Sequence, residues 1–77
     1  MSPAKLEISD HAHERLKQRQ ITRQQVREAL AGGDSIGVDL KGRRMIQKKI
    51  RGRYLVVVYL AVIGGFLVIT AYWKGEP

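Results

Sequence analysis

A histidine and two arginines spaced four residues apart are the side chains in this sequence best suited to chemistry. His11, Arg15 and Arg19 would form one slowly drifting stripe along a helix, beside the apolar positions Ala12 and Leu16. A histidine exchanges a proton near neutral pH, and arginines hold a phosphate and stabilise negative charge that develops during transfer. Together they could cleave RNA without a metal, with the 2′-hydroxyl as internal nucleophile. A solvated helix surface has the same spacing, so both interpretations stay open.

Few other residues suggest chemistry. Tyr72, near the end of the last predicted strand, is a candidate because its phenol could approach an active-site edge, although aromatic residues there also serve as packing. His13 would point away from His11 on a helix and lie on the surface. With no shared histidine face and no carboxylate cluster, we predict no metal site. The sequence has no Gly-rich phosphate loop and no nucleophile elbow, so we predict no cofactor.

The net charge of +7 originates in one segment. Residues 41–53 contain seven basic residues and no acid, whereas the basic and acidic residues in the rest of the chain cancel. Concentrated positive charge favours binding to a nucleic-acid backbone through counterion release. We predict the RNA-binding residues to be Arg43, Arg44, Lys48, Lys49 and Arg51. A basic edge strand that resists pairing with other chains is the alternative.

The stretch from Tyr54 to Trp73 has no charged residue, and any fold must bury much of it. Its length of about 20 residues suffices for one membrane-spanning helix. Its many β-branched residues and the central Gly64 and Gly65 instead favour two strands joined by a tight turn. We therefore predict a β-hairpin, with a small membrane protein as the alternative.

The elements before this hairpin complete an α+β fold. Ser9 or Asp10 can cap a first helix, Thr22 and Gln25 form a capping-box pattern for a second, and paired glycines at 32 and 33 would end it in the left-handed conformation. We predict one domain over residues 1–77: an arm (1–8), two helices (9–31) and a sheet (35–73). The two N-terminal helices would pack on one face of a four-stranded antiparallel meander.

The first strand of the hairpin is apolar on both of its faces, which indicates that both are covered. Two short helices cover only one face. The other would be protected by the N-terminal arm, by a second copy of the chain in a homo-oligomer, or by a partner protein. The chain also lacks cysteine and an N-terminal apolar run, which fits a cytoplasmic protein.

Five stretches between His11 and Trp73 carry a family resemblance: HAHERLKQRQIT, VREAL, KGRR, GRYLVVVY and VITAYW. Their order resembles the domain-of-unknown-function 4258 family, which is similar to the RelE/ParE toxin superfamily. The resemblance implies a RelE-like helix-helix-sheet fold and matches His11, Arg15 and Arg19 to the family's polar helix motif. That superfamily includes ribosome-dependent messenger-RNA endonucleases, gyrase inhibitors and proteins without known activity. The apolar LAVIGGF departs from the charged residues that family members commonly carry at the last hairpin.

The leading hypothesis is a RelE-like toxin or related RNA-acting protein, with metal-independent endoribonuclease activity. Lys48 and Lys49 would bind the RNA backbone, Arg15 and Arg19 would hold the scissile phosphate, and His11 would act as general acid or base. The expected partners are RNA, on the ribosome, and a neutralising antitoxin protein. The alternative is a non-catalytic module that binds nucleic acid or protein through the same basic strand.

Overall fold

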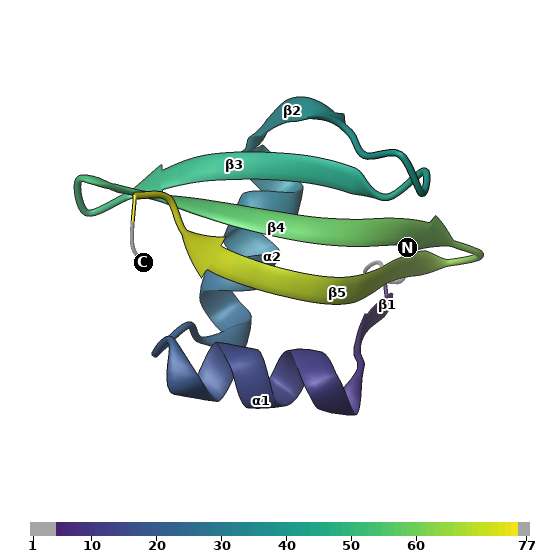
Figure 1. Cartoon of the computed structure of the whole chain (residues 1–77), viewed down its shortest axis with the longest axis horizontal. Helices are drawn as coiled ribbons and strands as arrows, with labels where there is room; N and C mark the ends of the chain where they lie inside the picture. Colours follow the sequence, from purple (N-terminus) through teal and green to yellow (C-terminus); the bar gives the residue numbers. More distant parts are fainter. Residues whose placement is uncertain (1–4, 76–77) are drawn as a thin grey trace.

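The computed structural model describes residues 5–75 as two helices and a five-stranded sheet (Figure 1). The elements in chain order are β1 (Lys5–Ile8), α1 (Asp10–Gln18), α2 (Arg23–Gly32), β2 (Asp34–Val38), β3 (Arg44–Ile50), β4 (Arg53–Val62) and β5 (Gly65–Trp73). The strand order across the sheet is β1-β5-β4-β3-β2. The α+β class is therefore confirmed.

The predicted hairpin is confirmed, because β4 and β5 pair antiparallel over most of their length. Its turn consists of Ile63 and Gly64, with Gly64 at a φ of 80° that suits glycine. Gly65 belongs to β5 rather than to the turn. Among residues 5–75, no helix is long and apolar enough to cross a membrane.

The prediction of four antiparallel strands is wrong, because the sheet has a fifth strand that runs parallel to its neighbour. Residues 5–8 of the predicted arm form β1, which pairs with the start of β5, Leu6 opposite Phe66. Leu6 is 5% exposed, so burial of its side chain explains why this short segment joins the sheet. Residues 1–4 of the predicted arm lie outside the described part of the chain.

Both helices begin as their sequences predict. The Ser9 side chain accepts a hydrogen bond from the Ala12 amide, and Thr22 forms a reciprocal capping box with Gln25. The predicted left-handed end of α2 is wrong, because Gly33 has a φ of −83° and an extended backbone. Glycine is needed there for space: a Cβ would lie 2.5 Å from the Ala29 carbonyl oxygen and 2.7 Å from that of Gln47.

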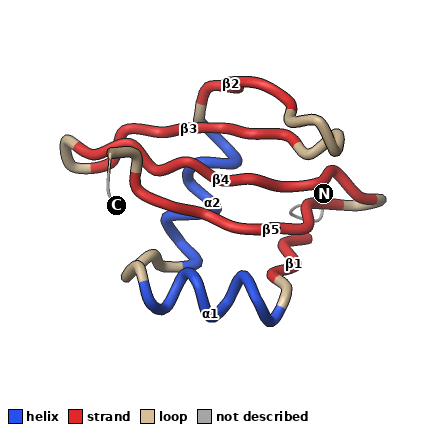
Figure 2. Tube along the Cα trace, in the orientation of Figure 1, coloured by secondary structure: helices blue, strands red, loops and turns tan. Residues whose placement is uncertain are grey.

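The core lies between the helices and one face of the sheet. α2 packs on β3 and β4, while α1 lies along β5 (Figure 2). Ala12 and Leu16 of α1 and Val26 and Ala29 of α2 meet Val57 of β4 in one buried cluster. β1 ends opposite Val68, so α1 takes the place beside the remaining outer edge of β5.

Candidate nucleic-acid interface

The sheet face opposite α2 is uncovered by any other element among residues 5–75 and is called the open face below. Figure 1 shows α2 behind the sheet, so the open face is turned toward the viewer. Alternation along the paired strands places on it Met45, Gln47 and Lys49 of β3, Tyr54, Val56 and Val58 of β4, and Thr70 and Tyr72 of β5. The expectation that the N-terminal arm covers this face is wrong for residues 5–8, which form an edge strand.

The two central valines of the open face are buried by the side chains around them. Val56 is 1% exposed although no helix lies above it. It stands between Gln47 and Tyr72 in adjacent strands, both half-buried, and side chains directly opposite each other in a sheet are in contact range. The Gln47 carboxamide oxygen is also buried and accepts no hydrogen bond within the described residues. The face therefore presents tyrosine and amide groups over an apolar floor.

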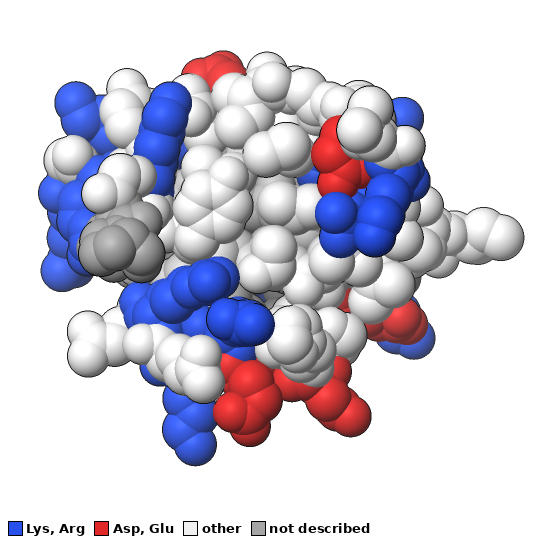
Figure 3. All heavy atoms as spheres, viewed as in Figure 1, with Lys and Arg blue, Asp and Glu red and all other residues white. Residues whose placement is uncertain are grey.

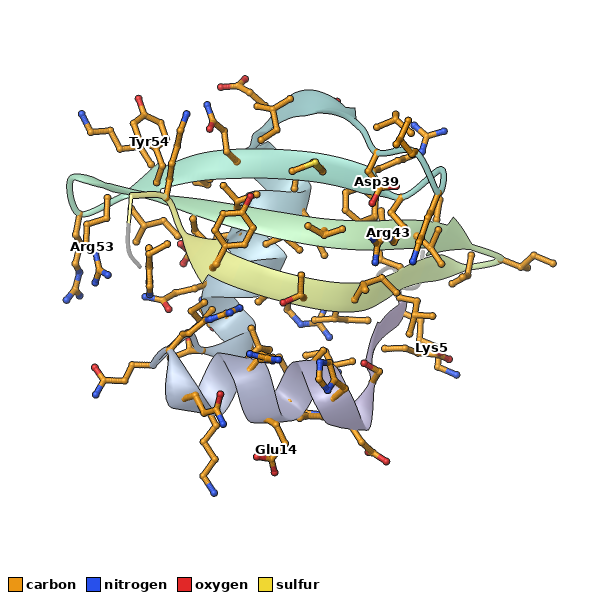
Figure 4. The ribbon with its side chains drawn as sticks, in the orientation of Figure 1. Lys5, Glu14, Asp39, Arg43, Arg53 and Tyr54 are labelled. Carbon is orange, nitrogen blue, oxygen red and sulfur yellow. The ribbon has the colours of Figure 1, made fainter. Side chains whose placement is uncertain are left out.

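Tyr54 is the most accessible aromatic ring on this face, at 41% exposure. The Lys49 ammonium lies 6.0 Å from its ring centroid, and the Lys74 amide donates to the Tyr54 carbonyl oxygen at 2.8 Å. Figure 4 shows Tyr54 at the left end of the sheet, next to the β3–β4 turn. An exposed aromatic ring beside cationic side chains is the arrangement that stacks single-stranded nucleic acid.

Positive charge gathers at this same end, which is called the basic end below and comprises Lys49, Arg51, Arg53 and Lys74. Arg51 lies in the β3–β4 turn, and the Arg53 guanidinium lies 4.2 Å from the Trp73 ring centroid. Figure 3 shows Lys and Arg atoms at the left end of the open face and along its border with α1, with uncharged residues in the centre. The open face thus has an uncharged centre and a cationic rim.

The basic segment 41–53 does not form one patch. Arg43 and Arg44 lie at one end of β3 and Arg51 follows the other, so they are separated by roughly 20 Å at about 3.3 Å per residue. The Arg43 Nε lies 2.6 Å from an Asp39 carboxylate oxygen, and Figure 4 shows both at the right end of the sheet. Burial raises the pKa of Asp39, but hydrogen bonds from Arg43 and Lys41 outweigh it and hold that pKa below its ordinary value.

Lys48 and Lys49, predicted to bind the same RNA backbone, occupy opposite faces of the sheet. Lys48 pairs with the buried Leu55, and its ammonium lies 3.4 Å from the position that a Cβ of Gly32 would occupy. That position is the C-terminal end of α2, where a cation complements the helix dipole. Only Lys49 belongs to the open face, because successive side chains of a strand point to opposite sides.

The predicted stripe on α1 lies along the border of the open face. The Arg15 Nε lies 3.5 Å from the His11 Nε2, a long contact between exposed side chains. Arg19 reaches the Thr70 hydroxyl at 3.3 Å, and Thr70 is on the same face as Tyr72 two residues later. Arg19 and Tyr72 therefore share one end of the border, whereas His11 lies about 12 Å away along the helix axis.

Arg19 also has a structural role that the sequence did not indicate. Its guanidinium donates to the Ala71 carbonyl oxygen at 2.8 Å, on the outer edge of β5 that β1 leaves unpaired. Its own carbonyl oxygen accepts from the Trp73 indole nitrogen at 3.1 Å. These contacts tie the end of α1 to the end of β5.

The described residues contain no group of three or more histidine, cysteine or acidic side chains that could hold a metal. His13 is exposed, and Figure 4 shows the neighbouring Glu14 pointing away from the sheet. Tyr54 was not among the residues that the sequence singled out. Its position between a basic segment and an apolar strand was the signal available.

A known protein family matches most of the chain. The family profile described as "Domain of unknown function (DUF4258)" matches residues 8–73. No curated protein and no solved structure gives a significant match to the chain.

Proposed function

The chain belongs to the DUF4258 family, and we propose that this member binds single-stranded RNA on the open face of its sheet. The observation that carries the proposal is the placement of Tyr54 and Tyr72 on an uncovered face with an uncharged centre, next to the basic end. Bases would stack on the two tyrosines, since every base offers a π-face. Lys49, Arg51 and Lys74 would contact the phosphates.

Two further observations support an RNA ligand on this face. The stripe from Arg15 to Arg19 along the α1 border offers a second line of positive charge, on which a backbone crossing the sheet would continue. The unpaired Gln47 oxygen beside Tyr72 could accept from the amino group of a stacked base once the side chain turns outward. An RNA ligand would meet this protein in the cytoplasm, which is the localisation that goes with the proposal.

Replacing the two tyrosines by leucine tests the stacking role. Tyr54→Leu and Tyr72→Leu keep an apolar cover over Val56 but remove the ring, so each should weaken binding of a labelled oligouridine by about 5- to 150-fold, from roughly 1–3 kcal/mol per stacked base. Fluorescence anisotropy over a salt series measures the affinity. Unchanged affinity in both variants would contradict the proposal.

The same salt series tests whether positive charge at the basic end contributes to RNA binding, with a matched control elsewhere on the chain. Lys49→Gln should lower the salt slope by about 0.7, the value for one phosphate contact on a single strand. Lys5→Gln removes the same charge from β1, away from the basic end, as Figure 4 shows, and should leave the slope nearly unchanged. Equal effects would mean that net charge rather than this site binds RNA. If the protein dimerises through the open face and binds no RNA, the open face is a dimer interface rather than an RNA-binding surface.

A more specific proposal for the same chain is that it is a RelE-like toxin. The helix-helix-sheet order after β1 supports it, and RNA cleavage would add chemistry to the proposed binding face. The observation that favours cleavage is the contact between Arg15 and His11, which puts a proton-transfer group next to a phosphate-binding group. A ribosome and an antitoxin would then be the partners.

Cleavage is tested with purified protein in EDTA, on free RNA and on translating ribosomes. If His11 transfers a proton, His11→Ala should slow cleavage by about 10²- to 10⁴-fold without a matching loss of RNA affinity. His13→Ala removes the other histidine of the same helix and should leave the rate unchanged. No cleavage by the wild-type chain on either substrate would leave the non-catalytic binding module as the function.

A further inference from the structure

An apolar pocket opens on the side of the molecule opposite the open face. It has a volume of about 270 Å³ and is lined by Leu6 of β1, Phe66 of β5, and Arg27, Leu30 and Ala31 of α2. Leu6 and Phe66 are direct partners across the β1–β5 pairing, and both pack against the core. The floor of the pocket is therefore part of the sheet, and α2 forms its wall.

Two residues that line this pocket, Leu6 and Phe66, are held in place by residues outside it. Arg23, one turn before Arg27 on α2, donates to the Leu6 carbonyl oxygen at 2.9 Å and ties the helix to β1. Phe66 packs edge-to-face on Tyr59, with ring centroids 5.4 Å apart. A pre-formed apolar cavity needs little rearrangement before it binds a ligand.

The size and charge of the pocket indicate what would occupy it. Its volume lies below the roughly 300–1,000 Å³ of typical small-molecule sites, so it suits one or two apolar side chains rather than a nucleotide. Arg27 is exposed on its lining, and no carboxylate among residues 5–75 pairs with it. An unpaired guanidinium next to an apolar cavity complements a segment that carries both an apolar side chain and a carboxylate.

We propose that this pocket docks an acidic segment of a partner protein, which inserts an apolar side chain between α2 and β1 and places a carboxylate on Arg27. The inference does not depend on RNA binding, because the pocket and the open face lie on opposite sides of the sheet. The net charge of +7 attracts an acidic partner to either side, and the apolar cavity fixes where it docks.

Three synthetic peptides separate the two parts of this recognition: DELLDE, its neutral counterpart NQLLNQ, and DESSDE, which lacks the apolar side chains. Each is titrated into the full, isotope-labelled chain to millimolar concentration and followed by amide chemical shifts. DELLDE should move signals of α2 and β1, NQLLNQ should bind more weakly, and DESSDE should not bind at this site. Absence of binding by DELLDE, or shifts confined to the open face, would overturn the proposal.

Variants then locate the site. Arg27→Gln should weaken DELLDE binding by about tenfold and leave NQLLNQ binding unchanged, whereas Lys41→Gln, at the same net charge, should change neither. Ala31→Trp should fill the pocket and abolish binding, while Gln18→Trp on α1 should not; Ala31 and Gln18 are both exposed. Unchanged affinity in Arg27→Gln and Ala31→Trp would refute docking here, as would oligouridine displacing the peptide from α2.

Discussion

Gly65→Ala is expected to unfold the parallel edge of the sheet and to lower the free energy of unfolding by about 2–4 kcal/mol. A Cβ at position 65 would overlap the backbone of Lys5, the residue paired with it across β1 and β5. Because the obstacle is backbone rather than the end of a flexible side chain, β1 must move away. Leu6 would then lose its burial, and the pairing from Lys5 to Ile8 would break.

Urea denaturation measures this loss, and the amide signals of β1 show where it occurs. Gly32→Ala is the matched control, since its Cβ would lie at an ordinary 3.4 Å from the ammonium at the far end of the Lys48 side chain. Alanine is favoured over glycine in a helix by up to about 1 kcal/mol, so this control should be neutral or more stable. A Gly65→Ala protein as stable as wild type would mean that β1 does not hold the sheet edge. Since Leu6 lines the apolar pocket, the same variant should also weaken DELLDE binding.

Arg19→Ala is expected to destabilise the protein by about 1.5–3 kcal/mol, the range for a hydrogen bond from a charged donor to a partly buried acceptor. The lost interactions are those with the Ala71 carbonyl oxygen and the Thr70 hydroxyl on the unpaired edge of β5. Lysine offers a single ammonium rather than a planar fork, so Arg19→Lys should restore only part of the stability.

Arg15→Ala is the matched control for this series, because it removes an arginine of the same stripe whose side chain makes only the long contact to His11 within the described residues. Arg15→Ala should change the free energy of unfolding by no more than about 0.5 kcal/mol, as most substitutions of exposed residues do. Denaturation midpoints and RNA affinity are measured on all three variants. If Arg19→Ala abolishes RNA cleavage or binding while its stability stays at the wild-type value, Arg19 acts on the ligand rather than on the fold.

The two sides of the sheet suggest a division of roles within one small chain. The open face offers stacking rings and a cationic rim, which suit RNA. The pocket beside α2 offers an apolar cavity and a guanidinium, which suit an acidic peptide. A partner docked there would leave the proposed RNA face accessible, so a ternary complex is sterically compatible with the fold.

Local features of this protein were determined by the sequence alone. The capping box at Thr22, the start of α1 at Ser9 and the β4–β5 hairpin all follow from side chains within a few residues of one another. The stripe of His11, Arg15 and Arg19 follows from helix periodicity in the same way. The family of the chain was also recognisable from its motifs, and the match over residues 8–73 confirms it.

Contacts between distant residues were decided only by the tertiary structure. The pairing of β1 with β5 joins residues about 60 positions apart, and no local pattern in a four-residue strand specifies that neighbour. Strand alternation alone puts Lys48 and Lys49 on opposite faces, but only the register of β3 decided that Lys48 faces α2 and Lys49 the open face. The hydrogen bond from Arg19 to Ala71 exists because β1 ends early and leaves one carbonyl of β5 without a strand partner.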